Sequence, residues 1–147
     1  MVTVRNGEGR TLTGMHLVET SVFTRLQRSE VRSRLDELPG ESLARCVVTD
    51  LELGHSSRNE REWDVVQSML DGFEAVDISS AVVRRAKEVQ RVLSAQGLRG
   101  RKVPDLLIAA AAEIEGMVVL HYDRDFEIIA GVTGQGHEWI LPAGSID

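Results

Sequence analysis

Short apolar runs separated by polar turns recur along the chain. A run of a few apolar residues bounded by turn signals is typical of a buried strand. The runs predict strands at His16–Glu19, Leu43–Val48, Ala75–Ile78, Met117–Tyr122 and His137–Leu141.

Between these runs, apolar residues recur at spacings of three and four, which is the period of an amphipathic helix. The stripes predict helices over Ser21–Gln27, from Thr49 onward, over Asn59–Phe73, from Ser79 or Ser80 to about Gly97, over Asp105–Glu115, and around Phe126–Ala130. Asn59 is placed to cap its helix, and Thr20 or Ser21 to cap the first one. The helix that begins at Asp105 is apolar through Ala112, so we expect it to pack deeply against a sheet.

Strands that alternate with helices indicate an α/β protein. We expect a three-layer α/β/α sandwich with a mainly parallel central sheet. The 147 residues suffice for one domain, which we place at residues 15–147. Residues 1–14 contain glycines and no periodicity, and they are expected to form a loose N-terminal extension.

Composition narrows the class of protein. No apolar run is long enough to predict a membrane span, and the polar N-terminus lacks the apolar core of a secretory signal. A single cysteine, Cys46, excludes an internal disulfide and favours the reducing cytoplasm. The net charge of −6 argues against a uniformly basic surface that grips nucleic acid, although acids gathered in one cleft can coexist with basic surfaces elsewhere.

Acidic residues cluster where the predicted strands end. In a parallel sheet, ligand sites form beyond the carboxyl ends of the strands, so these side chains are expected to converge. They are Glu19, Asp50, Glu52, Asp105, Asp123 and Asp125. Carboxylates this close repel one another unless a hard cation neutralises them, which predicts Mg²⁺ or Mn²⁺.

Each acid also has a purely structural interpretation. Asp105 stands at a helix start, where it would stabilise the N-terminus, and Asp123 or Asp125 would cap the following helix. Asp50 and Glu52 are about 200° apart around a helix, so at most one of them is expected to face the cleft. The joint arrangement therefore carries the metal hypothesis.

Four motifs resemble those of PIN-domain ribonucleases, and specifically of VapC-type toxins from bacterial toxin–antitoxin pairs. The resemblance runs from Leu17 to about Ser145. Its motifs are Leu17-Val-Glu-Thr-Ser-Val-Phe, Asp50-Leu-Glu-Leu-Gly-His, Pro104-Asp-Leu-Leu-Ile-Ala-Ala-Ala-Ala and Leu120-His-Tyr-Asp-Arg-Asp-Phe. The last two are the most specific.

The resemblance implies which acids act. Glu19, Glu52, Asp105 and Asp123 would be the catalytic metal ligands, with Asp125 as an accessory ligand. The family normally has aspartate where this chain has Glu19, and the extra methylene moves the carboxylate by about a bond length, while Mg²⁺ demands near-ideal octahedral geometry. Two readings therefore stay open at this point, an active nuclease and a catalytically impaired PIN-like module that binds RNA or protein.

By the same resemblance, the activity is divalent-metal-dependent hydrolysis of phosphodiester bonds in structured RNA such as tRNA or rRNA. A metal lowers the pKa of a bound water and stabilises the transition state. Because this water, and not the ribose 2′-hydroxyl, attacks the phosphodiester, the expected products are a 5′-phosphate and a 3′-hydroxyl. A VapB-type antitoxin and a second copy of the chain are the implied partners. The candidate docking surfaces are Val22–Leu26 and Trp63–Phe73.

Hydroxyl and basic residues flank the acids. Thr20 or Ser21 is placed to hydrogen-bond a ligand carboxylate, and His55 is close enough to Glu52 to border the cleft. Before Asp105 stand Arg99, Arg101 and Lys102, a loop suited to gripping RNA phosphates, and a second basic run comprises Arg25, Arg28, Arg32 and Arg34. Aromatic residues make up only 4% of the chain, so we expect recognition of the RNA backbone and shape more than stacking on bases.

Two other kinds of site are disfavoured. The four histidines show no paired metal-binding spacing, which argues against zinc. A phospho-acceptor receiver domain would need a lysine late in the chain, and none follows Lys102.

Overall fold

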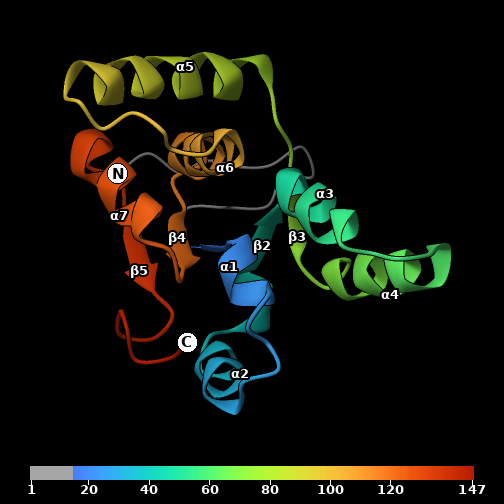
Figure 1. The fold of residues 1–147 in the computed structure, drawn as a ribbon. Helices are drawn as coiled ribbons and strands as arrows, with labels where there is room; N and C mark the ends of the chain where they lie inside the picture. The colour runs from blue at the N-terminus through green and yellow to red at the C-terminus, as the bar shows by residue number, and fades with distance from the viewer. Residues whose placement is uncertain (1–14) are drawn as a thin grey trace.

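A parallel sheet organises the molecule in the computed structural model, which describes residues 15–147 (Figure 1). The predicted N-terminal extension, residues 1–14, lies outside the described residues. The strands are β1 (His16–Val18), β2 (Leu43–Cys46), β3 (Glu74–Val76), β4 (Val118–His121) and β5 (His137–Trp139). Their order is β3-β2-β1-β4-β5, and every neighbouring pair is parallel, so the expected fold class is confirmed.

Helices connect the strands and cover both faces of the sheet. They are α1 (Thr20–Phe23), α2 (Ser29–Asp36), α3 (Val47–His55), α4 (Glu60–Leu70), α5 (Ser80–Ala95), α6 (Val103–Ile114) and α7 (Arg124–Thr133), with one 3₁₀ turn at Gly40–Ser42. Figure 1 shows α5 and α6 on one side of the sheet and α1 and α2 on the other. The chain therefore forms three layers.

Two apolar cores lie on opposite faces of the sheet. Successive residues of a strand point to opposite faces. Accordingly, Leu17 packs in the core beneath α5, α6 and α7, while its neighbour Val18 packs against α1 and α2. On the adjacent strand, Val119 and Leu120 divide in the same way. Strands β1 and β4 are thus buried on both faces, as expected for the centre of a parallel sheet.

Helix α1 is shorter than the periodicity predicts, because it ends at Phe23 and not at Gln27. The segment after it contains a separate helix, α2, that the sequence analysis did not anticipate. Val31 and Leu35 are four residues apart and bury one face of α2 in the second core. This weak stripe is obscured in the sequence by the surrounding arginines.

Other boundaries shift by a few residues at strand–helix junctions. β2 ends at Cys46, and α3 begins at Val47 and not at Thr49, since a run of buried apolar residues does not by itself distinguish strand from helix. α6 begins at Val103, two residues before Asp105, because proline at position 104 suits the first helical turn. The predicted cap at Asn59 is confirmed, and Ser79 caps α5.

Two further properties of the described residues bear on the expectations from composition. Within residues 15–147, no helix is long and apolar enough to cross a membrane. Cys46 is a buried free thiol at the end of β2.

The central strand makes a prediction about stability. Leu17 is fully buried on β1, so Leu17→Ala should lower the free energy of unfolding by about 2–5 kcal/mol, measured by urea denaturation. Val65, on α4, is 65% exposed, and Val65→Ala is the control, with a change within about 0.5 kcal/mol. Equal effects of the two substitutions would contradict the burial of β1 between two layers.

Candidate metal centre

The carboxyl ends of the central strands open into a pocket lined by carboxylates. Glu19 directly follows β1, and Asp123 follows β4 after one intervening residue. Asp105 comes from the first turn of α6, and Glu52 comes from α3. All four of these acids line one open pocket of about 580 Å³. The fold thus brings together residues that are separated by up to about a hundred positions in the sequence.

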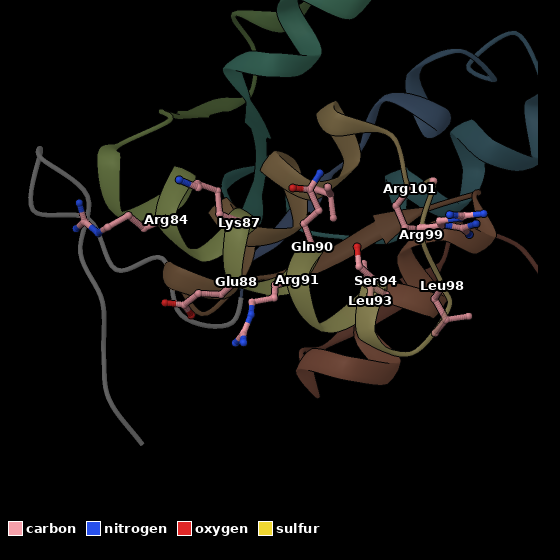
Figure 2. Close-up of a pocket in the computed structure, with 12 residues that line it drawn as sticks. Arg84, Lys87, Glu88, Gln90, Arg91, Leu93, Ser94, Leu98, Arg99 and Arg101 are labelled. Carbon is pink, nitrogen blue, oxygen red and sulfur yellow. The ribbon is translucent and has the colours of Figure 1, made fainter.

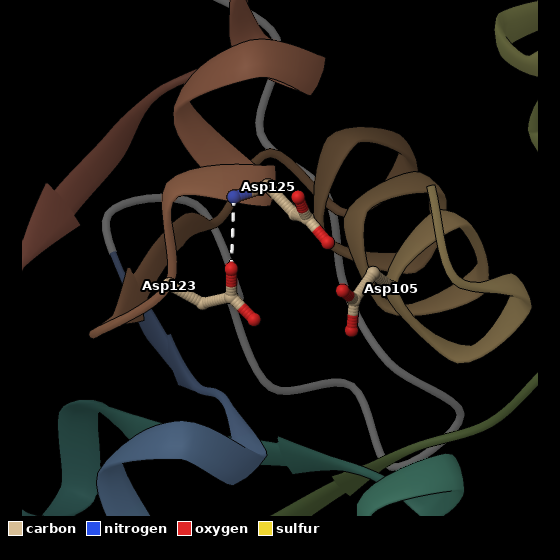
Figure 3. A group of neighbouring side chains, drawn as sticks. All are labelled: Asp105, Asp123 and Asp125. Atoms are coloured by element: carbon tan, nitrogen blue, oxygen red, sulfur yellow. Dashed lines mark hydrogen bonds between the residues drawn. The ribbon is translucent and has the colours of Figure 1, made fainter. Parts of the chain in front are cut away.

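Three aspartates form the tightest group of acids (Figure 3). Asp105, Asp123 and Asp125 each offer a carboxylate oxygen, and these oxygens all lie within 4.8 Å of one another. Asp105 is only 4% exposed, and its buried Oδ2 has no hydrogen-bond partner. A buried carboxylate oxygen without a partner among other carboxylates is an arrangement that a cation would stabilise.

Asp105 does not cap its helix. The N-cap position of α6 is Lys102, and no side chain makes a capping hydrogen bond there. Burial, followed by the neighbouring carboxylates of Glu19, Asp123 and Asp125, raises the pKa of Asp105 to about 8. Asp105 thus stands in the first turn of α6 without capping it, and its carboxyl group is held in a place where its charge is costly.

Asp123 has two roles in the structure. Its Oδ1 accepts a hydrogen bond of 2.9 Å from the backbone N–H of Asp125 and so caps α7, while the residue also lines the pocket. Asp125 accepts a hydrogen bond of 2.7 Å from Nη1 of Arg101. Arg101 was predicted to bind an RNA phosphate, but in the structure its guanidinium group is paired with Asp125.

Glu19, and not Thr20 or Ser21, caps α1. Both carboxylate oxygens of Glu19 lie 2.9 Å from the backbone nitrogen of Ser21, and the Ser21 hydroxyl donates to Oε2 at 2.8 Å. The residue is 3% exposed. Burial raises its pKa to about 7, although the hydrogen bonds from Ser21 oppose the shift. The carboxylate is therefore oriented by its own helix start as well as by the pocket.

Of the two acids on α3, only Glu52 faces the pocket. The Thr20 hydroxyl donates to Oε1 of Glu52 at 2.7 Å. Because the single hydroxyl proton of Thr20 is engaged there, the Thr49 hydroxyl donates to the Thr20 oxygen at 2.8 Å. Asp50 instead accepts two hydrogen bonds from Arg45, at 2.8 and 3.1 Å. Thr20 and Ser21 thus each bond a pocket carboxylate, Glu52 and Glu19 respectively.

The basic residues predicted to bind RNA do not all lie at the carboxylate pocket. Lys102 lines the carboxylate pocket, whereas Arg99 does not. In the second basic run, Arg25 and Arg28 both pair with Asp147, Arg34 pairs with Glu37, and Arg32 donates to the backbone carbonyl of Leu26. His55 is exposed at the end of α3 and is absent from the pocket lining.

The C-terminal segment forms a wall of the pocket that the sequence did not reveal. Trp139, Gly144, Ile146 and Asp147 line the pocket opposite the acids. The Tyr122 hydroxyl fastens this wall, donating to the carbonyl of Ile146 at 2.9 Å and accepting from its N–H at 3.1 Å. The segment has no periodicity, and its contacts join distant positions, so no local pattern could have predicted it.

A buried histidine supports the acidic loop after β4. His121 is fully buried, and its Nδ1 accepts a hydrogen bond of 3.2 Å from the backbone N–H of Asp123. Burial, followed by repulsion from His137, lowers the pKa of His121 to about 4, so the ring is neutral near pH 7. Its proton then sits on Nε2, which lies 3.0 Å from Nδ1 of His137. The sequence analysis assigned no role to this residue.

The donor set fits a hard divalent cation. Carboxylate oxygens are the protein ligands that Mg²⁺ and Mn²⁺ prefer. Besides Asp147, which is paired with Arg25 and Arg28, the pocket offers four carboxylates. The raised pKa values of Glu19 and Asp105 and the unpartnered Oδ2 of Asp105 mark an excess of negative charge there. No sulfur or imidazole ligand is required for such a site.

The chain is similar in sequence to several characterised proteins. The family model described as "PIN domain" matches residues 16–132. Ribonuclease VapC51 of Mycobacterium tuberculosis is 50% identical over 133 residues, which cover 90% of this chain and 97% of that protein. Ribonuclease VapC21 of the same species is 40% identical over 137 residues, covering 91% and 99% respectively.

Solved structures share the fold. The DNA-bound VapBC from Salmonella typhimurium matches with a TM-score of 0.73 at 23% identity, covering 86% of this chain and 98% of the matched one. FitAcB from Neisseria gonorrhoeae matches with a TM-score of 0.71 at 21% identity, over the same shares of both chains. These structural matches bear on the fold alone, whereas the sequence matches define the relationship. The chain belongs to the PIN-domain family, and it is similar in sequence to VapC ribonucleases of that family.

Proposed function

We propose that the protein is a divalent-metal-dependent endoribonuclease, the toxin of a VapBC-type toxin–antitoxin pair. The observation that carries the proposal is the acidic pocket lined by Glu19, Glu52, Asp105 and Asp123. Two of these acids, Asp105 and Asp123, also have oxygens within 4.8 Å of one another and of Asp125, which lies outside the pocket lining. The relatives VapC51 and VapC21 are named as ribonucleases, which supports the same reaction class.

In this proposal Glu19, Glu52, Asp105 and Asp123 hold Mg²⁺ or Mn²⁺, with Asp125 as an accessory ligand. When bound, the ion supplies positive charge that makes water acidic and offsets charge developing on the phosphate. Thr20 and Ser21 hold two of the carboxylates in place by donating to Glu52 and Glu19.

Basic residues on the rim of the pocket would hold the RNA. Lys102 and Arg124 line it together with the carboxylates, so phosphates on either side of the scissile bond would meet positive charge there. Arg124 was not singled out in the sequence, because it stands between the two aspartates of the motif. With few aromatic residues, the chain is suited to a structured substrate such as tRNA or an rRNA loop.

The proposal includes two partners and a location. One solved relative is described as VapBC bound to DNA, and we propose a VapB-type antitoxin and a second copy of the chain as partners here. Of the two candidate docking segments, Val22–Leu26 is largely buried in the core, whereas α4 exposes Trp63, Val65 and Met69. We therefore place docking on α4. The buried free thiol of Cys46 suits the reducing cytoplasm.

The nuclease site is tested by removing one buried ligand. Asp105→Asn should lower cleavage of total RNA in Mg²⁺ or Mn²⁺ by about a hundredfold or more, because it removes a buried carboxylate of the pocket whose Oδ2 has no hydrogen-bond partner. Sequencing of new 5′ ends measures the cleavage, and EDTA should abolish it. The matched control is Glu127→Gln, an exposed acid on α7 outside the pocket lining, which should cleave like the wild type. Cleavage by Asp105→Asn at the wild-type sites and rate would refute the site.

The glutamate at the family's aspartate position makes a second prediction. Both oxygens of Glu19 are directed at the Ser21 amide, whereas an aspartate N-cap usually engages one oxygen. Glu19→Asp should therefore free an oxygen for the cation and raise kcat/KM for RNA cleavage several-fold. A large gain from an almost inactive wild type would favour the impaired binding module. A loss of activity would mean that the longer side chain is the better ligand.

The raised pKa of Asp105 predicts how stability depends on pH. The pKa is about 8 in the folded protein and 3.8 in the reference state, so the folded protein binds more protons between these values and loses stability as the pH rises through them. In EDTA, Asp105→Asn should melt about 3 °C or more above the wild type at pH 8, and the difference should shrink towards pH 4. Differential scanning fluorimetry measures both. A difference that does not change with pH would contradict an ionisation cost at Asp105.

A further inference from the structure

A second, cationic groove lies beside α5 and shares no lining residue with the carboxylate pocket. Five cationic side chains and one acidic one line it, although the whole chain has 23 acidic against 17 basic residues. Figure 2 shows the side chains of Arg84, Lys87 and Arg91 on successive turns of α5, and those of Arg99 and Arg101 on the loop that follows the helix. The groove therefore concentrates positive charge on a protein that is negative overall.

The cations on this face of α5 are largely uncompensated. Arg85, on the neighbouring face, is tied to Glu88 and Glu113, which uses the one acid of the groove. Within residues 15–147, Lys87 and Arg91 form no ion pair. The second basic run differs, because Arg25 and Arg28 are paired with Asp147 and Arg34 is paired with Glu37. Unpaired cations gathered on one face are available to an external anion.

The groove adjoins the carboxylate pocket through one loop. Arg101 lines the groove and also donates to Asp125 of the acidic group, and Lys102, the next residue, lines the carboxylate pocket. The loop turns at Gly97 and Gly100, whose φ values of +72° and +92° favour glycine. A chain of phosphates leaving the pocket would therefore pass over this loop and reach α5.

We propose that the groove formed by α5 and residues 98–101 binds the sugar–phosphate backbone of the RNA substrate at a distance from the scissile bond. This inference rests on the proposed nuclease function. Lys87 and Arg91 are four residues apart, one helical turn of about 6 Å along α5, so both can contact one strand of phosphates. Such contacts fix the position of an RNA arm without reading its sequence.

An extended polyanion fits the groove better than a small ligand does. The cations are spread along about two turns of helix and a loop, whereas a single small anion would need them to converge on one point. Leu93, Leu98 and Leu106 supply apolar lining between the cations. An acidic peptide is the competing occupant, and the experiment separates the two.

The test removes two charges from the groove and compares the result with the same loss elsewhere. Lys87→Gln/Arg91→Gln is the test variant, and Arg58→Gln/Arg61→Gln, at exposed positions just before and within α4, is the control. Fluorescence anisotropy in EDTA follows binding of a fluorescein-labelled RNA hairpin across a series of KCl concentrations. The test variant should bind about tenfold more weakly at low salt, with a slope of log K against log[KCl] shallower by about 1 to 2. The control should bind like the wild type.

Three results would decide the matter. Equal binding by the test and control variants would overturn the proposal, as would a loss of affinity for labelled polyglutamate with RNA affinity unchanged. In Mn²⁺, a raised KM with kcat unchanged for hairpin cleavage by the test variant would support it. Because anisotropy needs no cleavage, an inactive wild type that still bound RNA through α5 would count against the nuclease function and leave the groove in place.

Discussion

Repulsion among carboxylates at the end of the sheet is the constraint on which the site depends. The fold holds Asp105 at 4% exposure near Glu19, Asp123 and Asp125, and the result is a pKa of about 8 for a carboxyl group that ordinarily titrates near 4. Folding alone would not favour such a cluster. The stability that the two apolar cores provide is what keeps it assembled, and this separation of roles explains why the acids stand at strand ends and helix starts while the cores lie within the layers.

The general fold follows from the sequence because each level of the pattern agrees. Short apolar runs alternate with amphipathic stripes, and all of the predicted strands occur near their expected positions. What was missed has a physical cause. Helix α2 depends on Val31 and Leu35 finding a tertiary partner, and the start of α3 depends on where a continuous buried run changes from strand to helix. Neither is a local property of the chain.

The acids of the site were also predictable, whereas their partners were not. Residue type and position were enough to select Glu19 and Asp123, which follow strands, and Asp105, which stands at a helix start. Helical geometry allowed only one of Asp50 and Glu52 to face the pocket. The contact between Arg101 and Asp125 and the wall held by Tyr122 join segments far apart in the chain. Sequence patterns locate the side chains that do chemistry, and the tertiary structure decides which charges remain free.

The fastening of the C-terminal wall has a practical consequence. Ile146 is held by a single tyrosine hydroxyl and Asp147 by two arginines, so the last residues border the pocket directly. A purification tag or fluorescent protein joined after residue 147 would place its linker at the mouth of the site. A small environment-sensitive dye at that same end would instead report when the mouth becomes occupied, without any change to the acids themselves.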